Sequence, residues 1–556
     1  MISPFQAVLI GLIYFAANTS FLGGLAYFTI WRPLINGLLV GLVLGNPLTG
    51  LYTGAFVNVL YLGYMSVGGT LGIGDAALAG ILGATLSITF APASPVNAIG
   101  VGVIFGVLLG NIGFPLLTLR MRLDNRIVHH MEQAALRGDT RGLMRWNILG
   151  GQGLLLLITL PPAAIVAYSS LLILNLAFPY VPAWAWHGLG LSGTSLASAL
   201  GIALALRFVF KRYGILSFFA GFLLQVGLGI SSAGLSLAIL IGGALALMTH
   251  RILNAGIILP HPVRKQPASG NGLYRNSTLE HSIETAPPPI ARGAQKPGQT
   301  PPVRSWTTFA LWQFFSHSSY SFERMQGSGV ACALAPALAQ LYPNASERAL
   351  ALQCNLSFFN VEPNWGSILI GVLLRLEQER ADDEQIHTTK QTLMGTMSGF
   401  GDTVSQGAIL PLVLSIGLGL SLNSIGSLSP IWGAVIYLGI ICPLMVLISC
   451  ISFHVGYTRG RDGALAILAN PLLKSSVSVA EWLSAFTLGG LAALPAITGL
   501  HLVHMGQAID VWLNYAITFA LVMALFWLTQ WLHIKPVWVL LGLVVAGMLL
   551  AALGAA

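Results

Sequence analysis

Residues 151–177 read GQGLLLLITLPPAAIVAYSSLLILNLA and carry no charged side chain. The charge-free stretch is longer than this segment and extends from 146 to 206. A run of about 20 apolar residues is long enough to cross the hydrocarbon core of a bilayer as a helix. Because lipid offers no hydrogen bonds to the backbone, such a stretch predicts membrane-spanning helices.

The composition extends this prediction to the whole chain of 556 residues. Hydrophobic residues make up 55% of it and charged residues only 8%, with a mean hydropathy of +0.78. Soluble domains carry roughly three times as much charge, about 25%. Residues 1–119 contain only two charged side chains, Arg32 and Asp75. We therefore expect an all-α polytopic membrane protein. Because no basic region precedes the first apolar segment, we expect this segment to stay in the protein and not to be cleaved as a signal peptide.

The formal net charge of +8 is concentrated in three basic blocks, at 120–145, 207–212 and 251–304. Because cytoplasmic loops collect Arg and Lys, we expect all three blocks on the cytoplasmic side. They separate hydrophobic segments, so we interpret them as markers of topology and expect no nucleic-acid partner. The four cysteines have neither metal-ligand nor CxxC spacing. We expect no metal site and no cofactor.

Hydrophobicity collapses between 261 and 304, where Pro, Gly, Ser and basic residues predominate. This composition is typical of a flexible linker, because such a segment cannot bury enough apolar surface to fold. We therefore divide the chain into a first membrane domain (1–260), a cytoplasmic linker (261–305) and a second membrane domain (306–556).

One short pattern occurs in both membrane domains, as GIGD at 72–75 and GFGD at 399–402. It places Asp75 and Asp402 in apolar surroundings, where an acid is costly and often functional. Glycine-interrupted apolar segments at corresponding places in two halves point to a transporter site. The alternative is that each Asp caps a short helix.

Longer motifs resemble a known family. RPLINGLLVGLVLGNPLTGLYTGAFVNVLYLGYMSVGG (32–69), followed by GDAALAGI, resembles the C subunit of the mannose-fructose-sorbose family of bacterial phosphotransferase-system permeases. Three motifs resemble the D subunit of the same family: SFERMQGSGV (321–330), LSFFNVEPNWGSILIGVLLRLEQERA (356–381) and MGTMSGFGDTVSQG (394–407).

This resemblance implies a sugar permease in which C and D subunits are fused in one chain of the bacterial inner membrane. It implies two halves with broken or re-entrant helices, related by an inverted repeat, and an elevator-type movement in a homotrimer surrounded by lipid. The sugar would be phosphorylated by a separate phosphorylated B component, with an A component upstream. The chain itself would then need no phosphorylated residue and no catalytic residue. Candidate docking surfaces for the B component are the charged segments 120–146 and 375–390.

Sugars have many hydroxyls and no charge, so their sites need carboxylate, amide and hydroxyl groups in a fixed arrangement. The polar residues of the apolar blocks supply candidate sugar ligands: Asn58, Ser66, Asp75, His317, Ser321, Glu323, Gln326 and Asp402. Several of these, including Asn58, Ser66 and His317, differ from the usual family residue, which concerns the identity of the sugar more than the fold. Each also has a purely structural alternative, as a backbone-bonded or interfacial side chain.

Glu323 and Arg324 are adjacent, and adjacent residues on a helix do not face each other. We therefore expect each of these charges to have its own partner.

Two other functions remain open from the sequence. A sugar facilitator or receptor without coupling to phosphorylation would carry the same motifs. An intramembrane aspartyl protease of the GxGD type is less consistent, because one of its two aspartates follows a tyrosine. Neither Asp75 nor Asp402 does.

Overall fold

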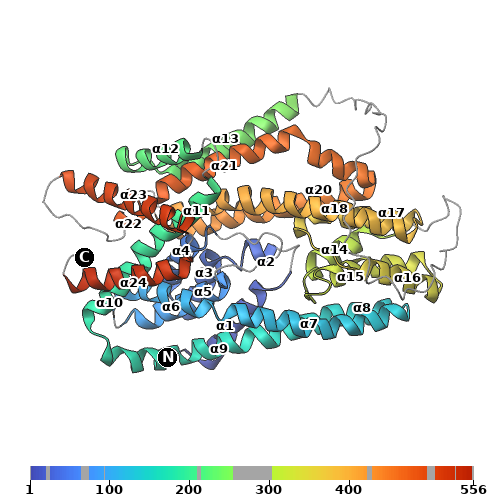
Figure 1. Cartoon of the computed structure of the whole chain (residues 1–556), viewed down its shortest axis with the longest axis horizontal. Helices are drawn as coiled ribbons and strands as arrows, with labels where there is room; N and C mark the ends of the chain where they lie inside the picture. The colour runs from blue at the N-terminus through green and yellow to red at the C-terminus, as the bar shows by residue number, and fades with distance from the viewer. Residues whose placement is uncertain are drawn as a thin grey trace.

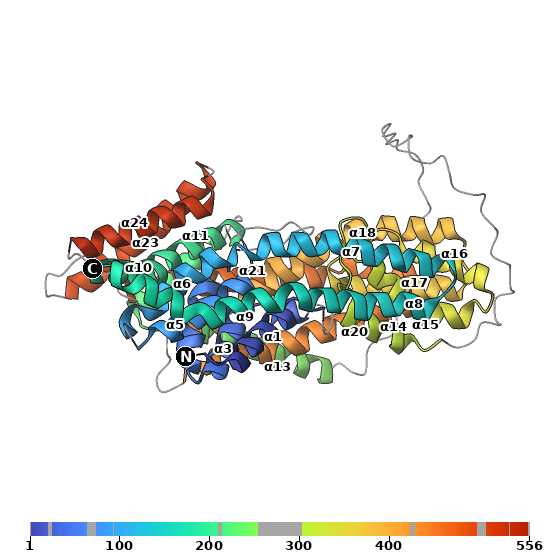
Figure 2. The same cartoon turned by 90° about the horizontal axis from the view of Figure 1, so that it is seen from below.

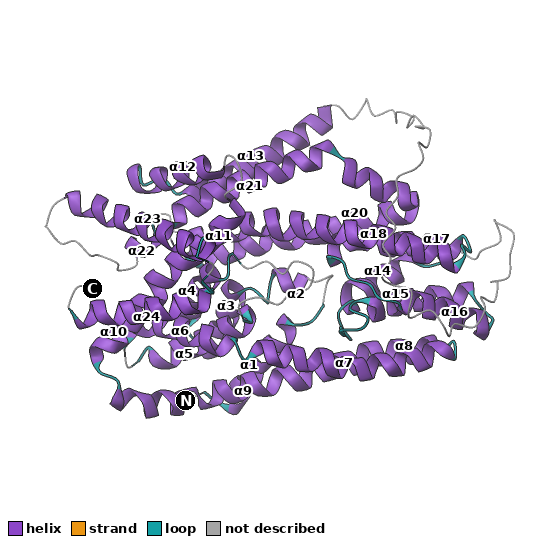
Figure 3. Cartoon of the chain, in the orientation of Figure 1, coloured by secondary structure: helices purple, strands orange, loops and turns teal. Residues whose placement is uncertain are grey.

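The computed structural model describes residues 2–20, 25–63, 74–92, 94–209, 214–253, 303–422, 429–497, 508–532 and 534–553. The regular elements in these residues are helices (Figure 3), and two isolated β-bridges join Met325 to Ser321 and to Phe359. Seven helical stretches in the described part are long and apolar enough to cross a membrane. The expected all-α polytopic membrane fold is confirmed. Most of the predicted linker lies outside the described residues.

The first half of the chain contributes thirteen α-helices, one 3-10 turn and two π-helical turns to the described part. They are α1 (Pro4–Ala17), α2 (Leu25–Phe28), α3 (Pro33–Leu44), α4 (Pro47–Leu60), α5 (Ala76–Phe90), α6 (Pro95–Gly110), α7 (Gly113–Leu136), α8 (Thr140–Arg145), η2 (Trp146–Gly150), α9 (Gly151–Ala177), η3 (Phe178–Tyr180), α10 (Ala183–Leu191), η4 (Ser192–Leu196), α11 (Ala197–Val209), α12 (Gly214–Gly227) and α13 (Ser232–Leu253).

The second half contributes eleven α-helices and one π-helical turn to the described part. They are α14 (Ser305–Phe315), α15 (Gly327–Leu341), α16 (Ala345–Leu356), α17 (Pro363–Gln378), α18 (Asp383–Val404), η5 (Ser405–Ile409), α19 (Leu410–Leu422), α20 (Ile431–Ala469), α21 (Pro471–Leu491), α22 (Leu494–Ile497), α23 (Ala508–Gln530) and α24 (Pro536–Ala552).

Long helices run along the length of the molecule and connect its two ends (Figure 1). At one end α15 and α16 of the second half pack against α8 and α7 of the first half, and α14 and α17 lie at the same end. At the other end α3 to α6 lie near α10, α11 and α24. Seen from below, α7 and α9 run side by side between these ends (Figure 2).

Local sequence explains several helix boundaries and one close packing. Proline occupies the first turn of α3, α4, α17, α21 and α24, where its missing N–H costs nothing. Between α3 and α4, a side chain added at Gly37 would begin 2.5 Å from the carbonyl oxygen of Gly50. Glycine is therefore required for this contact, as is common between membrane helices.

Both large hydrophobic cores contain residues from both halves of the sequence. One joins buried side chains such as Leu34 and Val57 to Leu414 and Tyr437. The other joins Met131 and Leu143 to the core of α15 and α17. The boundary at 261–305 therefore divides the sequence but does not divide these cores. The division into two domains, the inverted repeat and the elevator movement stay predictions.

The segment from 321 to 326 is a turn rather than a helix, and α15 begins after it at Gly327. Arg324 pairs with Glu132 of α7, with 2.7 Å between Nη2 and Oε1. Glu323 accepts a hydrogen bond of 3.1 Å from Asn125, also on α7. The expectation that each charge has its own partner is confirmed, and both partners come from the other half of the sequence.

Candidate functional site

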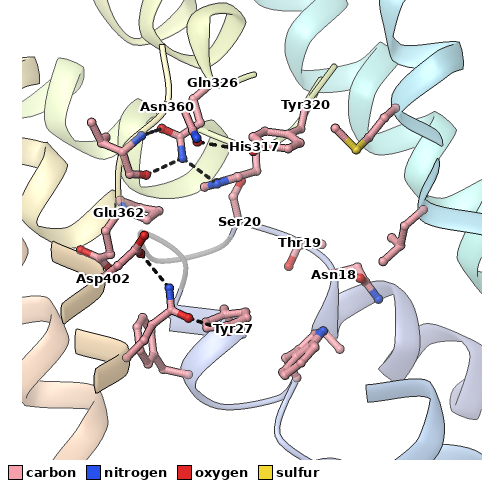
Figure 4. A pocket seen from close by; sticks show the side chains of 18 of the residues that line it. Asn18, Thr19, Ser20, Tyr27, His317, Tyr320, Gln326, Asn360, Glu362 and Asp402 are labelled. Atoms are coloured by element: carbon pink, nitrogen blue, oxygen red, sulfur yellow. Dashed lines mark hydrogen bonds between the residues drawn. The ribbon is translucent and has the colours of Figure 1, made fainter. Parts of the chain in front are cut away.

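A cavity lies between the two halves of the chain. Its volume of about 260 Å³ is slightly below the usual lower limit for small-ligand pockets, about 300 Å³. Its walls come from α1, α2 and α7 in the first half, and from α18, η5 and the segments preceding α15 and α17 in the second. Hydrogen-bonding and charged side chains gather there (Figure 4): Asn18, Thr19, Ser20, Tyr27, Arg120, His317, Tyr320, Gln326, Asn360, Glu362, Ser398, Asp402 and Gln406.

Gln326 connects two segments of the cavity wall. Its Oε1 accepts from the backbone N–H of Val361 at 3.0 Å, and its Nε2 donates to the carbonyl of Val361 at 2.8 Å. Its own backbone N–H donates to the carbonyl of Phe359 at 2.8 Å. These three bonds hold the segment before α17 against the start of α15 and fix which way the amide of Gln326 points.

His317 lies in the turn after α14, and both of its ring nitrogens have partners. Gln326 Nε2 lies 2.9 Å from His317 Nε2, and Ser316 Oγ lies 3.1 Å from Nδ1. Because an amide nitrogen only donates, His317 Nε2 accepts and the proton is on Nδ1. Burial, together with nearby Arg120, lowers the pKa of His317 to about 4. The imidazole is therefore neutral at physiological pH.

Glu362 precedes α17 and caps its first turn. Its Oε2 accepts from the backbone N–H of Trp365 at 2.8 Å, and its Oε1 accepts from Asn364 Nδ2 at 2.7 Å. Asn364 is held in turn by Ser449, whose hydroxyl donates to Asn364 Oδ1 at 2.9 Å. Burial, with a smaller contribution from nearby Asp402, raises the pKa of Glu362 to about 7 against the lowering effect of these bonds. A buried carboxyl with this pKa changes protonation state close to neutral pH.

Asp402 lies near the end of α18 and belongs to a chain of hydrogen bonds that joins the halves. Gln406 Nε2 donates to Asp402 Oδ1 at 2.8 Å, and Tyr27 Oη donates to Gln406 Oε1 at 3.1 Å. Gln406 lies in η5, and π-helical turns within longer helices are frequent at functional sites. The chain places a phenol of the first half and a carboxylate of the second on one cavity wall.

Arg120 extends from α7 into the cavity wall and holds the turn that carries His317. Its Nη2 donates to the carbonyls of His317 and Ser318 at 2.7 and 3.0 Å. Its Nε lies 3.2 Å from Oδ2 of Asp124, which is fully buried. This cation therefore stabilises the position of the turn and compensates a buried carboxylate of its own helix.

Arg32 lies directly behind the aromatic part of the wall. Its guanidinium carbon is 4.7 Å from the ring centre of Tyr27 and 4.9 Å from that of Trp31. The side chain is 1% exposed, and its Nε and Nη2 have no hydrogen-bond partner among the residues that the structure describes. Cation–π contact with two rings offsets part of the cost of burying this charge.

Of the eight residues predicted from the sequence, the structure brings His317, Gln326 and Asp402 together in the cavity. The others that it describes do not line it. Asn58 is buried in α4 and accepts from the backbone N–H of Leu34. Ser321 is also buried, and Glu323 faces Asn125. Ser66 lies outside the described residues.

Asp75 caps α5 and is fully engaged in that role. Its Oδ1 accepts from the backbone N–H groups of Ala77 and Leu78 at 2.9 and 3.2 Å. Its Oδ2 accepts from the hydroxyl of Tyr14 at 2.6 Å. The cavity is lined by Asp402 and not by Asp75, so the structure separates the two aspartates that the repeated motif had grouped.

Sequence reasoning missed several cavity residues, among them Tyr27, Arg120, Tyr320, Asn360 and Glu362. Asn360 and Glu362 lie inside a motif that the sequence analysis singled out. A signal for Glu362 was therefore present: it is a carboxylate next to Pro363 at the start of an apolar helix. Tyr27 and Arg120 gave no such signal, because their place in the cavity depends on contacts between the two halves.

The described residues hold no group of three or more His, Cys, Asp or Glu side chains arranged to bind a metal ion. The cavity itself contains two carboxylates, those of Glu362 and Asp402, and the neutral imidazole of His317. These groups can donate and accept hydrogen bonds and can exchange protons.

Comparison with known proteins assigns the two halves to two family models. Residues 4–248 match the model of the sorbose-specific IIC component of the phosphotransferase system. Residues 304–556 match the model of the IID component of its mannose/fructose/sorbose family.

Individual relatives agree with this division. The second half is 28% identical over 249 residues to the mannose-specific EIID component of Escherichia coli K12, a match that covers 41% of this chain and 86% of the relative. The fructose permease IIC component of Bacillus subtilis is 29% identical to this chain over 216 residues. The match covers 38% of this chain and 77% of the relative. The sorbose-specific EIIC component of Klebsiella pneumoniae is 28% identical to this chain over 198 residues. This match covers 35% of this chain and 71% of the relative.

A cryo-EM structure of the mannose transporter ManYZ with microcin E492 contains a chain 24% identical to this one. It has a TM-score of 0.27, and the match covers 45% of this chain and 96% of that chain.

Proposed function

The chain belongs, through a IIC half and a IID half, to the mannose/fructose/sorbose permeases of the phosphotransferase system, and we propose that it binds its sugar in the cavity between these halves. IIC and IID components of this system work with a sugar and with IIA and IIB components. The bound sugar would be passed across the bacterial inner membrane and phosphorylated by a phosphorylated IIB partner.

The observation that carries this proposal is the composition of the cavity wall. Amides, hydroxyls and carboxylates from both halves surround a space of about 260 Å³. Tyr27, Trp31 and Tyr320 add aromatic faces, against which the C–H face of a sugar ring can pack. A sugar site needs both properties, because a sugar carries several hydroxyls and one or more apolar faces.

The sugar itself belongs to the family's range, and we propose mannose, fructose or sorbose as first candidates. An assembly of three copies that carries the sugar by an elevator-type movement of one part of each copy remains part of the proposal. The contacts between α7 and the turn at 321–326 fit a rigid unit that includes residues of both halves.

An aspartyl protease does not fit this arrangement. Asp75 is occupied as a helix cap and Asp402 lies in the cavity wall, so the two carboxylates do not share the described cavity.

Transport and phosphorylation can be tested together in proteoliposomes that contain the purified chain. Uptake of radiolabelled mannose, fructose or sorbose is expected to yield sugar phosphate inside only when phosphorylated IIB partner is present. Entry of free sugar at an equal rate without the partner would instead favour an uncoupled facilitator.

A further inference from the structure

We propose that Glu362 is the general base of the phosphoryl transfer, the group that takes the proton from the sugar hydroxyl that becomes phosphorylated. The inference rests on the proposed function, because it requires a sugar in the cavity and a phosphorylated partner. It assigns a catalytic residue to a chain whose family role needs no phosphorylated residue of its own.

The step balances with the groups named. The oxygen of a sugar hydroxyl attacks the phosphorus of the phosphorylated IIB partner, so a P–O bond to the sugar forms. The bond between phosphorus and the partner's side chain breaks, and the electron pair of that bond stays with the partner. The hydroxyl proton passes to the Glu362 carboxylate and leaves to solvent when the sugar phosphate departs.

Glu362 is positioned in the wall of the cavity and away from bulk water. Glu362 lines the cavity and is 4% exposed, so its carboxylate faces a bound molecule rather than bulk water. No cation pairs with Glu362 among the described residues; its partners there are the neutral donors Asn364 and Trp365. A carboxylate compensated by neutral donors keeps its basicity, whereas pairing with an arginine would lower it.

Hydrogen bonds hold the carboxylate of Glu362 in a fixed orientation. The hydroxyl of Ser449 orients Asn364, and Asn364 orients the carboxylate of Glu362, so the base is positioned by a second group and that group by a third. Gln326 anchors the backbone of Val361, immediately before Glu362. A base held in this way needs little reorganisation when the hydroxyl arrives.

The other titratable and charged groups around Glu362 also matter for its role. Asp402 on α18 and Arg120 on α7 also line the cavity, as do the titratable side chains of His317, Tyr320 and Tyr27. Burial and Arg120 hold the pKa of His317 at about 4, and burial raises the pKa of Tyr320 to about 12.

Neither of these two groups therefore changes protonation near neutral pH. Around the helix start that carries Glu362, α14 contributes Trp312, whose Nε1 donates to the Pro363 carbonyl, and α20 contributes Ser449; both side chains are uncharged. The pKa of Glu362, about 7, matches what a base needs to accept a proton at physiological pH.

The test uses the purified full chain, phosphorylated IIB partner and mannose, fructose or sorbose, whichever binds. The rate of phosphoryl transfer in single turnover is expected to fall as pH drops below about 7, because protonated Glu362 cannot accept the hydroxyl proton. Glu362→Gln is expected to lower this rate by about 100-fold or more, since general bases contribute on the order of 10²–10⁴. Its affinity for the sugar is measured by calorimetry and the rate is compared at saturating sugar, so that weaker binding by the amide is not counted as loss of catalysis.

Glu362→Asp keeps a carboxylate and a helix cap, so it is expected to retain the pH dependence at a reduced rate. Glu377→Gln is the matched control, because Glu377 is a fully buried glutamate on α17 that does not line the cavity. It is expected to leave both the rate and its pH dependence unchanged.

Near-wild-type transfer with the same pH dependence in Glu362→Gln would overturn the assignment. If Glu362→Gln does not fold, Glu362→Asp decides, and an unchanged rate in that variant would count against the proposal. If Asp402→Asn abolished the fall in rate at low pH while Glu362→Gln retained it, the role would move to Asp402 and the assignment would be contradicted. Failure of wild type to bind any of the three sugars would instead refute the proposed function itself.

Discussion

At the residue scale, cation–π contacts and hydrogen bonds hold the charged groups around the cavity. Arg32 lies on one side of Tyr27, and Asp402 lies at the far end of the hydrogen-bond chain that starts at the Tyr27 hydroxyl. Arg120 uses its donors on backbone carbonyls and on Asp124. Because the described partners of Glu362 are the neutral donors Asn364 and Trp365, its carboxylate can also accept a hydrogen bond from a ligand.

Replacing Arg32 by Met is expected to leave the thermal unfolding midpoint of the sugar-free protein unchanged or raised. Substituting a buried charge by an apolar side chain of similar length is often neutral or stabilising. Arg120→Met is the contrasting variant, and it should lower the midpoint because two carbonyls and Asp124 lose their partner. A large loss of stability in Arg32→Met alone would show that the charge is needed in the unliganded fold.

The two aspartates of the repeated motif should behave differently. Asp75→Ala is expected to destabilise the protein by about 1–2 kcal/mol, as loss of a helix cap does, and to leave sugar affinity unchanged. Asp402→Asn is expected to weaken sugar binding, because a charged acceptor becomes an amide. Thermal unfolding and calorimetry on both variants check this. Equal loss of affinity in the two would restore the original interpretation that both belong to one substrate path.

The sequence indicated which types of residue form the site, but it did not indicate which of the candidate residues reach the cavity. Asp402 and Gln326 were recognisable because a polar group inside an apolar motif is costly unless it is used. Asp75 satisfied the same criterion, yet Tyr14 and two backbone N–H groups occupy it. Nothing in the sequence near 75 indicates that Tyr14 would reach it, because the contact spans 61 residues of chain.

At the element scale, the site depends on short irregular segments between rigid helices. The turn after α14, the segment before α17 and the π-helical turn η5 supply most of its second-half wall. Gln326 connects the first two of these segments through both of its side-chain polar atoms. The helices themselves were predictable from apolar runs, whereas these irregular segments depend on hydrogen bonds between residues distant in sequence.

Gln326→Leu is expected to lower stability and to abolish sugar binding. It leaves the N–H and C=O of Val361 without their partner, and each buried unsatisfied group costs about 1–3 kcal/mol. Gln353→Leu is the control, because Gln353 is an exposed glutamine on α16. Thermal unfolding followed by calorimetric titration separates the two effects. If Gln326→Leu kept normal affinity, the turn would have no part in forming the site.

At the scale of the whole molecule, the two halves of the sequence form shared hydrophobic cores. Composition alone identified the break at 261–304 and the membrane-spanning character on both sides of it. It did not indicate that α7 and α8 would pack on α15 and α16, because amphipathic helices carry no label for their partner. The family resemblance supplied the pairing of C and D but not these contacts.

Chains cut within the linker should still assemble. Fragments 1–262 and 303–556, expressed together, are expected to co-purify, because burial of apolar surface between the halves favours association without a covalent link. Affinity purification through a tag on one fragment measures this. Recovery of the tagged fragment alone would mean that the linker contributes more than a tether.

The central claim is that the cavity between the halves holds the sugar, and calorimetric titration of a cavity-filling variant tests it most directly. Ser398 lines the cavity, whereas Thr396 on the same helix is exposed and does not. Wild type and Thr396→Trp are expected to bind mannose, fructose or sorbose with equal affinity, while Ser398→Trp, which fills the cavity, should show no binding. If folded Ser398→Trp bound the sugar as tightly as wild type, the sugar would bind elsewhere and the account would be wrong.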